Sequence, residues 1–502
     1  MTTISYILIF LLILILAIVI IALVRALSFG KKSSAVSLNA ETKTVELDPM
    51  LMAEHLSRVI QCKTVSSLDH SAVDLAEFDQ LHKILEADFP VLHQKLEKTV
   101  LNGHNLIYRW EGSHTDLDPI LLMAHQDVVP VDPATAEEWT EPGFSGKIAD
   151  GRIWGRGSQD CKNVMISAME AVEALINSGY TPERTIYLAF GQDEEVGGAA
   201  GQKEISAHFK EQNIHFAAVL DEGGAIMRGM MPGVKAPMAL IGNAEKGYLS
   251  LELKATGDGG HSSMPPSIST IGKLARAIAQ VENNPVPGTP KRVVPMFAAM
   301  GVHTPFIFKL AFGNLWLFRN FLMKRFTANP RTAAMIRTTT AVTIVNGGVK
   351  DNVLPSEASA IVNFRIAPGD TIEGIIEYIQ YLVAPYNVEV SIAGEHPWEA
   401  SAVSDPNSPA FDHLADAIQA QFGEIAIAPY TVMGATDARY YNELSENVFR
   451  FSAVKMESEQ LNSIHNINEY ITVDQFKQSV EFLVALIQRW GQAAWMKQGN
   501  EN

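Results

Sequence analysis

The sequence contains little cysteine and comparatively few basic residues. Its two cysteines, Cys62 and Cys161, are far apart, which excludes a disulfide-stapled scaffold and a zinc site built from several cysteines. Lys and Arg number 39 against 56 Asp and Glu, so the formal net charge is −17. Nucleic-acid binding depends on clustered Lys and Arg, and this charge balance argues against it. Internal repeats and low-complexity segments are also absent.

The composition is that of a large folded protein. Of the 502 residues, 47% are hydrophobic and 19% are charged. This composition supplies a large core and excludes disorder over most of the chain. At roughly 150 residues per domain, the length predicts two to four domains.

Residues 4–24 form one long apolar run without a charged side chain. At about 1.5 Å per helical residue the run spans about 30 Å, the thickness of the hydrocarbon core of a bilayer. A cleaved signal peptide is the alternative, but no Lys or Arg precedes the run, and the run exceeds the usual h-region. We therefore predict a single-pass membrane protein with a transmembrane helix at residues 4–24 and a polar linker at residues 25–48.

The orientation of this helix is a separate question. Arg25, Lys31 and Lys32 follow the apolar run and favour a cytoplasmic body by the positive-inside rule. Three charges are a small signal, so the sequence leaves the side of the membrane open.

Three short apolar segments, residues 119–124, 185–191 and 217–220, each end in polar residues. They have the length and composition of buried parallel strands. Between the first two, residues 163–177 have apolar residues at helical spacing, and Gly179 follows their end. We therefore predict an α/β fold with a doubly wound, mainly parallel sheet. Sites in such sheets form at the carboxyl ends of the strands.

A second domain is predicted within the first. From residue 244 the pattern becomes strand, helix, strand, strand, helix and strand, which is the ferredoxin-like order. We predict one large domain in two parts, residues 49–243 and 398–495, around an inserted α+β domain at residues 244–397, which we call the lid domain.

Residues 285–335 are a further insertion, rich in large apolar side chains and containing Lys309, Arg319, Lys324 and Arg325. Three interpretations are open: a hydrophobic wall for a long acyl chain, an amphipathic helix lying on the membrane, or a helix packed on its own domain.

Side chains able to bind metals follow the predicted strand ends and recur near the C-terminus. Each one alone has an ordinary explanation, such as a helix cap, a solvated loop acid or a structural histidine. Together they form a mixed nitrogen and oxygen set that suits zinc, with cobalt or manganese as alternatives. Five ligands are too many for one tetrahedral zinc but suit two metals about 3.5–4 Å apart with one bridging carboxylate. The set is His125, Asp160, Glu195, Asp221 and His465.

Two neighbouring features refine this interpretation. Asp193, Glu194 and Glu195 are consecutive carboxylates, which repel one another unless a cation neutralises them, so we expect a base next to a ligand. The glycine-rich turn before Asp160 lacks the third glycine of a dinucleotide fingerprint, and no phosphate-binding loop is present. We therefore reject a nicotinamide cofactor.

The sequence resembles the M20 family of di-zinc peptidases and amidohydrolases. The motifs that carry the resemblance are HQDVVPVD, GQDEEVGG, LDEGG, GHSS, NVLP and HNINE, which occur in the family's order over about residues 45–490. The details FGQDEEVGG and GATDARYY look most like the carboxypeptidase S and PM20D-type branch.

The resemblance implies a role for each metal ligand. His125 and Asp221 would bind one zinc, Glu195 and His465 would bind the other, and Asp160 would bridge the two. Asp127 would orient His125, and Glu194 would be the general base that acts on a metal-bridging water. Cys161 is a departure, since relatives of that branch often have a second Asp there.

The resemblance also implies substrate contacts, mostly in the second domain. His261 would polarise the scissile carbonyl, often across a dimer interface. Asn352 and Arg365 have the family's spacing, and Arg365 offers a fork of donors that suits a substrate carboxylate. The loop of residues 434–439 is expected near that carboxylate, with substrate contacts from Gly434, Thr436, Asp437 and Arg439.

The function implied is hydrolysis of an amide next to a free carboxylate, by a carboxypeptidase or an N-acyl-amino-acid amidohydrolase. Small peptides or N-acyl amino acids would be substrates, and a homodimer through the lid domain is plausible. An aminoacylase or desuccinylase acting on a specific small metabolite is the main alternative, because pocket shape decides specificity. A non-catalytic binding protein on the same fold is a weaker alternative, since the ligand set and the base are all present.

Overall fold

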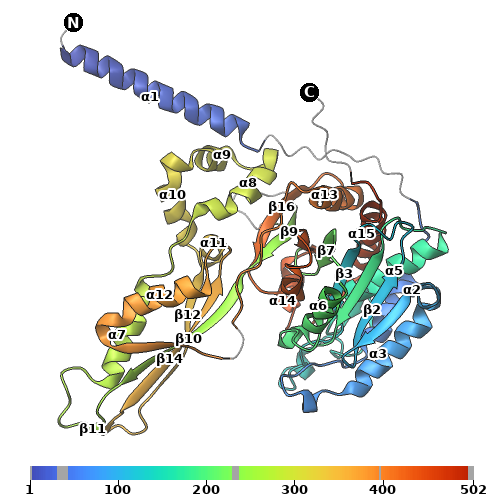
Figure 1. The fold of residues 1–502 in the computed structure, drawn as a ribbon, viewed down its shortest axis with the longest axis horizontal. Helices are drawn as coiled ribbons and strands as arrows, with labels where there is room; N and C mark the ends of the chain where they lie inside the picture. The colour runs from blue at the N-terminus through green and yellow to red at the C-terminus, as the bar shows by residue number, and fades with distance from the viewer. Residues whose placement is uncertain (1–2, 31–42, 229–236, 395–396, 496–502) are drawn as a thin grey trace.

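The computed structural model describes residues 3–30, 43–228, 237–394 and 397–495 (Figure 1). Half of the predicted linker, residues 31–42 with Lys31 and Lys32, lies outside the described residues. The described chain forms a larger part around one broad sheet and a smaller elongated part beside it, with a long N-terminal helix above the smaller part (Figure 1).

The larger part is built on a ten-stranded sheet with the order β1-β2-β6-β3-β7-β17-β9-β8-β18, in which β16 also pairs with β9. Neighbours among β6, β3, β7 and β17 run parallel, whereas β1-β2, β2-β6, β17-β9 and β8-β9 are antiparallel. The pairs β16-β9 and β18-β8 are also parallel, so the sheet is mixed. The strands are β1 (Glu97–Leu101), β2 (Asn105–Trp110), β3 (Ile120–His125), β6 (Ile186–Gly191), β7 (Ala218–Asp221), β8 (Ile226–Met227), β9 (Met238–Glu245), β16 (Ala426–Val432), β17 (Val448–Arg450) and β18 (Lys455–Met456).

Helices cover both faces of this sheet, because alternate side chains of the buried strands point to opposite faces. Leu122 of β3 packs in the core with α2, α5, α13 and α15, whereas Leu121 and Met123 pack with α6 and the 3₁₀-helix η7. The helices of the larger part are α2 (Pro49–Ile60), α3 (Leu75–Asp88), α4 (Pro90–Lys95), α5 (Lys162–Asn177), α6 (Gln202–Glu211), α13 (Pro409–Phe422), α14 (Ser458–Ser463) and α15 (Val473–Trp490). A small antiparallel sheet of β4 (Ile148–Ala149), β5 (Arg152–Trp154) and β19 (Tyr470–Thr472) lies in the same part.

The smaller part has a four-stranded antiparallel sheet in the order β12-β14-β10-β15. Its element order is strand, helix, strand, strand, helix, strand, and both helices share one core with the sheet. A two-stranded ribbon of β11 and β13 extends from its far end (Figure 1). The elements are β10 (Gly247–Thr256), β11 (Gly260–His261), α7 (Thr270–Asn283), β12 (Thr339–Gly347), β13 (Val353–Leu354), β14 (Glu357–Ile366), α12 (Ile372–Val383) and β15 (Val388–Ile392).

The insertion between α7 and β12 forms four short helices: α8 (Val294–Ala299), α9 (Phe306–Gly313), α10 (Leu315–Thr327) and α11 (Pro330–Ile336). Their buried side chains, such as Phe297 and Phe312, pack in one core with Met238 and Leu240 of β9 and with Ala428 of β16. The insertion interrupts the smaller domain in sequence, but its core is shared with an edge of the large sheet.

Seven 3₁₀-helices complete the described elements: η1 (His70–Ala72), η2 (Ala136–Glu138), η3 (Glu194–Val196), η4 (Pro290–Val293), η5 (Gly301–His303), η6 (Ala384–Tyr386) and η7 (Asp437–Tyr441). The N-terminal helix α1 (Thr3–Ser28) has the length and composition of a membrane span or a signal sequence, and almost all of its side chains are exposed.

Candidate metal centre and cleft

The carboxyl ends of β6, β3 and β7 meet at one edge of the large sheet, because these neighbouring strands run parallel. His125 is the last residue of β3 and pairs with Gly191, the last residue of β6. The loop after β6 leads into η3, which begins with Glu194 and Glu195. Side chains that are far apart in sequence therefore converge at this edge.

Asp160 lies between two histidines. Its Oδ1 is 3.1 Å from Nε2 of His125, and its Oδ2 is 3.0 Å from Nε2 of His465. His465 Nε2 is also 3.2 Å from Oε2 of Glu195. Burial opposes the charged form of Asp160, but its hydrogen bonds to the two histidines lower the pKa of the carboxyl. The same carboxylates of Asp160 and Glu195 raise the pKa of His465 to about 10.

Asp127 is fully buried behind His125. Nδ1 of that ring is 2.9 Å from the backbone carbonyl oxygen of Asp127 and 3.3 Å from its Oδ1, so Asp127 is in position to orient the imidazole. The same carboxylate accepts hydrogen bonds from Ser66 Oγ at 2.6 Å and from the backbone N–H groups of Glu194 and Glu195 at 3.1 Å each. Asp127 therefore couples the orientation of His125 to the position of η3.

The two acidic residues at the end of β7 point to different places. Asp221 accepts a hydrogen bond from the N–H of Ala438 at 2.8 Å, which directs its carboxylate to the face covered by η7. Glu222 instead places Oε1 3.3 Å from Nε2 of His125. Strand alternation explains this division, since Val219, two residues before Asp221, also packs on the η7 face. Burial, followed by the charge of Asp160, raises the pKa of Glu222 to about 8.

The structure thus brings together four of the five predicted metal ligands and places Glu222, which the sequence analysis did not single out, beside His125. His125, Asp160 and Glu195 offer ligand atoms within 4.8 Å of one another, and so do His125, Cys161 and Glu222. Oε1 of Glu195 is buried without a hydrogen-bond partner. Two histidines, clustered carboxylates and an unpartnered oxygen are a donor set that fits zinc.

Cys161 is fully buried, and its Sγ accepts a hydrogen bond from the backbone N–H of His125 at 3.2 Å. Burial raises the pKa of the thiol well above its usual value. Because metal coordination requires the thiolate, this environment favours a packing role at the start of α5 over a ligand role.

Glu194 is the first residue of η3 and precedes Glu195, one of the predicted metal ligands. Burial is the main reason that its pKa is raised well above the usual value for Glu, and the charges of Asp437 and Glu222 act in the same direction. A carboxylate with a raised pKa is a better proton acceptor near neutral pH.

The loop that presents Asp160 is held by Glu469, a second residue missed from sequence. Its Oε1 accepts from the backbone N–H groups of Gly157 at 3.0 Å and Gln159 at 2.8 Å, and its Oε2 pairs with Arg156 at 2.5 Å. The carboxylate is fully buried, and burial raises its pKa to about 7. Glu469 lies four residues after His465. The same segment therefore supplies a histidine next to Asp160 and holds the loop that carries Asp160.

A cleft of about 1250 Å³ lies between the large sheet and the smaller domain, and Glu195 lines it. Four side chains stack across this cleft wall. The ring of Trp398 stacks on Tyr248 at 4.9 Å, with the Arg439 guanidinium 4.9 Å from the Trp398 ring and the Arg365 guanidinium 5.0 Å from the Tyr248 ring. Both predicted arginines therefore belong to one cation–π column that joins the two domains.

The other members of the predicted loop have mixed surroundings. The backbone N–H of Thr436 donates to Glu245 at 2.9 Å, and Gly434 is exposed with open space around its Cα. Asp437 is buried against Gly198, and burial raises the pKa of its carboxyl well above the usual value. Thr436 and Asp437 are thus buried and hold the loop against the protein, whereas Arg439 lines the cleft.

His261 and Asn352 lie elsewhere. They are neighbours in the β11–β13 ribbon, where the N–H of Ser262 donates to the carbonyl of Asn352 at 3.2 Å, and both side chains are exposed. Figure 1 shows this ribbon at the far tip of the smaller domain, away from the large sheet. Within one chain, the structure does not bring these two residues to the His125 cluster.

Comparison with known proteins identifies the family. The model of "Peptidase family M20/M25/M40" matches residues 121–489. The chain belongs to this family. It is a metallohydrolase of the M20 type, as the motifs predict.

Relatives and solved structures agree with this membership. The chain is 37% identical to "Probable carboxypeptidase S-like 2" of Dictyostelium discoideum, over 88% of this chain and 85% of that protein. It is also 37% identical to the human "N-fatty-acyl-amino acid synthase/hydrolase PM20D1", over 87% of both chains. The crystal structure of an M20 family metallo-carboxypeptidase, Sso-CP2 from Sulfolobus solfataricus, has the same fold, with a TM-score of 0.62, 18% identity, and coverage of 88% of this chain and 99% of that one.

The buried pair of Glu469 and Arg156 leads to a prediction about stability. Glu469→Ala leaves Arg156 buried without its partner and frees the Asp160 loop, so we expect a loss of about 3–5 kcal/mol in the free energy of unfolding. Denaturant unfolding of the detergent-solubilised protein, followed by tryptophan fluorescence, measures the loss. Glu459→Ala at an exposed position is the control. Equal unfolding midpoints for the two variants would contradict the assignment.

Proposed function

We propose that this protein is a membrane-anchored, zinc-dependent hydrolase that cleaves an amide bond next to a free carboxylate in small peptides or N-acyl amino acids. The observation that carries the proposal is the Asp160 carboxylate between His125 and His465 beside a cleft that Arg439 lines. Membership of the M20 family and the names of the relatives, a carboxypeptidase and an N-fatty-acyl-amino acid hydrolase, support the same reaction class.

The metal site that we propose differs from the set predicted from sequence in one ligand. His125 and Glu222 would hold one zinc, Glu195 and His465 the other, and Asp160 would bridge them. Glu222 replaces Asp221 because its carboxylate faces His125, whereas that of Asp221 is hydrogen-bonded to Ala438. Cobalt or manganese would suit the same nitrogen and oxygen donors. Zinc bound there would polarise the amide carbonyl and lower the pKa of the attacking water.

Glu194 would be the general base. Its raised pKa suits it to take the proton of the attacking water on a carboxylate oxygen and to pass that proton to the leaving amine nitrogen. Asp127 would act through position, since it holds both the backbone N–H of Glu194 and the ring of His125.

The substrate carboxylate would bind between the arginine side chains of the cleft. Stacking on Tyr248 occupies the flat face of Arg365 and leaves its N–H edge for a carboxylate. Arg439 already donates to the carbonyls of Thr436 and Gly197, so it would add positive charge beside the cleft more than free N–H donors. His261 and Asn352 would contribute from a second copy of the chain, because the ribbon that carries them projects away from their own cleft. This arrangement supports a homodimer through the smaller domain.

Helix α1 would be the membrane anchor. Its residues 4–24 carry no charged side chain, and almost all side chains of the helix are exposed, as a lipid-facing span requires. Only its C-terminal end is covered by other parts of the chain.

The experiment that tests the reaction is turnover by the zinc-loaded, detergent-solubilised protein on N-acetyl, N-lauroyl and N-oleoyl amino acids and on carboxybenzoyl-blocked dipeptides. We expect chelator-sensitive cleavage of at least one of these classes, and none when the substrate carboxylate is amidated. Preference for long acyl chains would identify an N-acyl-amino-acid hydrolase, and cleavage of dipeptides alone a carboxypeptidase. Cleavage of neither class by metal-loaded protein would contradict the proposal and favour a deacylase of one specific metabolite.

The role of Glu194 predicts a separation of catalysis from metal binding. Glu194→Gln removes the proton acceptor but none of the ligands, so we expect turnover to fall about 10²–10⁴-fold while bound zinc stays unchanged. Steady-state kinetics and elemental analysis measure the two quantities. Glu204→Gln, at an exposed position in α6, is the matched control. Near-normal turnover of Glu194→Gln would show that another group is the base.

The two acids after β7 give a direct test of the metal ligands. Glu222→Gln should weaken binding of one of the two zinc ions, because it removes a charged oxygen ligand. Asp221→Asn should leave the stoichiometry at two, since its oxygen accepts from Ala438 rather than facing His125. Calorimetric zinc titration of the metal-free protein reports both. Loss of a zinc ion in Asp221→Asn alone would restore the assignment made from sequence.

A further inference from the structure

Helices α9 and α10 expose an unusual number of large apolar side chains. The exposed fractions of these five residues lie between 48% and 56%, in helices that follow one another directly: Phe306, Ile307, Trp316, Leu317 and Phe321. On α10, Leu317 and Phe321 are four residues apart and so lie on the same side of the helix. Soluble proteins rarely leave such a group uncovered, and its presence marks a surface that contacts a partner or a membrane.

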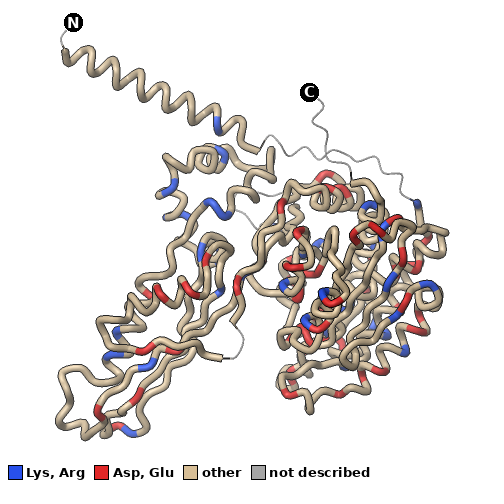
Figure 2. Tube along the Cα trace, viewed as in Figure 1, with Lys and Arg blue, Asp and Glu red and all other residues tan. Residues whose placement is uncertain are grey.

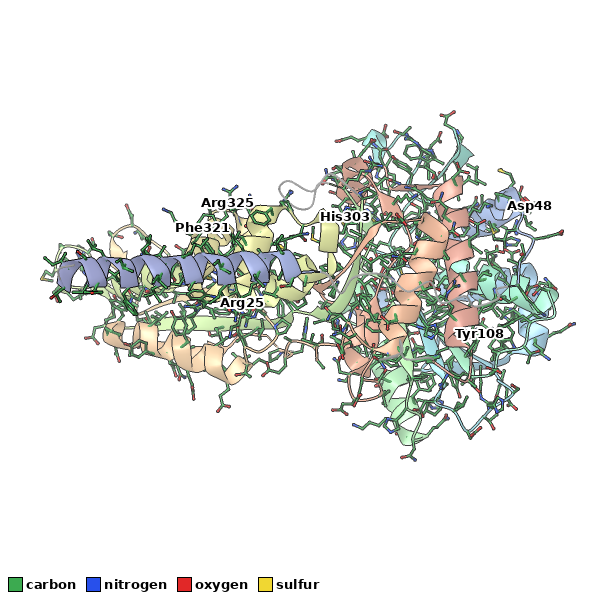
Figure 3. The ribbon with its side chains drawn as sticks, turned by 90° about the horizontal axis from the view of Figure 1, so that it is seen from above. Arg25, Asp48, Tyr108, His303, Phe321 and Arg325 are labelled. Atoms are coloured by element: carbon green, nitrogen blue, oxygen red, sulfur yellow. The ribbon has the colours of Figure 1, made fainter. Side chains whose placement is uncertain are left out.

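The same helices are attached to the end of α1. The side-chain amide of Asn314, between α9 and α10, donates to the carbonyl of Ala22 at 2.9 Å. The Cα of Gly313 lies so close to the carbonyl oxygen of Arg25 that an added Cβ would be 3.1 Å from it. Ala22 and Ala26 are the buried residues of α1, and Phe29 stacks on Phe312 at 6.4 Å. The last two turns of α1 therefore pack against α9 and the start of α10 (Figure 3).

This attachment fixes the depth of α9 and α10 relative to α1. Ala22 lies six residues before the last residue of α1, which is about 9 Å along a helix axis. A bilayer headgroup region is about 5–8 Å thick on each side of the hydrocarbon core. If α1 crosses the bilayer with residues 4–24, Ala22 lies about 3 Å inside the hydrocarbon boundary and Ser28 about 6 Å outside it. The helices packed on this part of α1 then lie at the boundary between hydrocarbon and headgroups.

The charges of the insertion point to the same environment. Residues 283–350 contain no Asp or Glu, although the chain as a whole has a net charge of −17. Residues 285–335 contain seven basic residues, and Arg319, Lys324 and Arg325 of α10 are exposed next to the apolar side chains. Figure 2 shows the helices beside α1 with blue segments and no red ones. A helix that combines exposed aromatic and basic side chains is typical of the interface of an anionic membrane.

We propose that α9 and α10 lie in the headgroup region of the bilayer that α1 spans, with Trp316, Leu317 and Phe321 inserted among the lipids and the basic side chains on anionic headgroups. This inference rests on the membrane span assigned to α1 under the proposed function. The core of the insertion includes Met238, Leu240 and Ala428 of the large sheet, so the docked helices hold the catalytic part at a set position against the membrane.

The test uses the full-length protein in nanodiscs that contain phosphatidylcholine and phosphatidylserine. The native cysteines, Cys62 and Cys161, are both buried, so a thiol-reactive fluorophore can be directed to single introduced cysteines. Leu317→Cys and Phe321→Cys report on α10, and Leu14→Cys reports on α1. Tyr381→Cys is the control, because Tyr381 is 78% exposed on α12 of the smaller domain. Quenching by nitroxide-labelled lipid and by aqueous iodide is measured at each position.

We expect lipid quenching at positions 317 and 321 to exceed that at position 381 several-fold, and iodide quenching to show the reverse order. Replacing Arg319, Lys324 and Arg325 together by Glu should reduce lipid quenching at position 317 and leave that at position 14 unchanged. These residues are remote from the His125 cluster, so turnover of each labelled protein verifies that it is folded.

Three outcomes would overturn the inference. Lipid quenching at position 14 combined with free access of iodide to positions 317 and 321 would mean that α1 spans the bilayer and α10 does not touch it. Protection of 317 and 321 from both quenchers would mean that protein, such as a second copy, covers them. Absence of lipid quenching at position 14 would instead refute the membrane span, which is the part taken from the proposed function.

Discussion

The carboxylate of Asp160 connects the two ends of the catalytic part. One of its oxygens faces His125 at the end of β3, and the other faces His465, 340 residues later in the chain. This contact is made only when β3, the loop before α5 and the segment before β19 are all in place. The geometry of the proposed metal centre thus depends on the complete fold of the larger domain rather than on any local motif.

Burying several carboxylates at one edge of the sheet is electrostatically unfavourable. Hydrogen bonds from neighbouring N–H, O–H and guanidinium groups reduce this cost for some of them. Asp127 receives three hydrogen bonds, and Glu469 receives backbone N–H groups together with the Arg156 guanidinium. Glu194 and Glu222 lack an equivalent set of donors, and burial raises their pKa values. In the described residues, the carboxylates without such donors are those beside His125 and Asp160, where a divalent cation would neutralise their charge.

The two domains have different tasks in this arrangement. The larger part supplies the proposed metal ligands and the proposed general base, whereas the smaller domain contributes Tyr248 and Arg365 to the cation–π column. The β11–β13 ribbon carries His261 away from its own cleft, which explains why a second copy enters the proposed reaction. The insertion packs on both the large sheet and α1 and so links them.

By itself, the sequence determined the parts that depend on local pattern. The central strands β3, β6 and β7, the helix α5 and the strand–helix order of the smaller domain follow from apolar periodicity and turn residues, and the M20 motifs identified the family.

Tertiary structure decided which of two adjacent acids, Asp221 or Glu222, faces His125, because the direction of a side chain at a strand end depends on the elements that cover each face. It also decided that Glu469 holds the Asp160 loop, that Trp398 and Tyr248 stack between two arginines, and that the insertion packs on β9, β16 and α1. These contacts join residues that are far apart in the chain. The apolar pattern of a segment predicts that one of its faces is buried, but it does not indicate which distant segment covers that face.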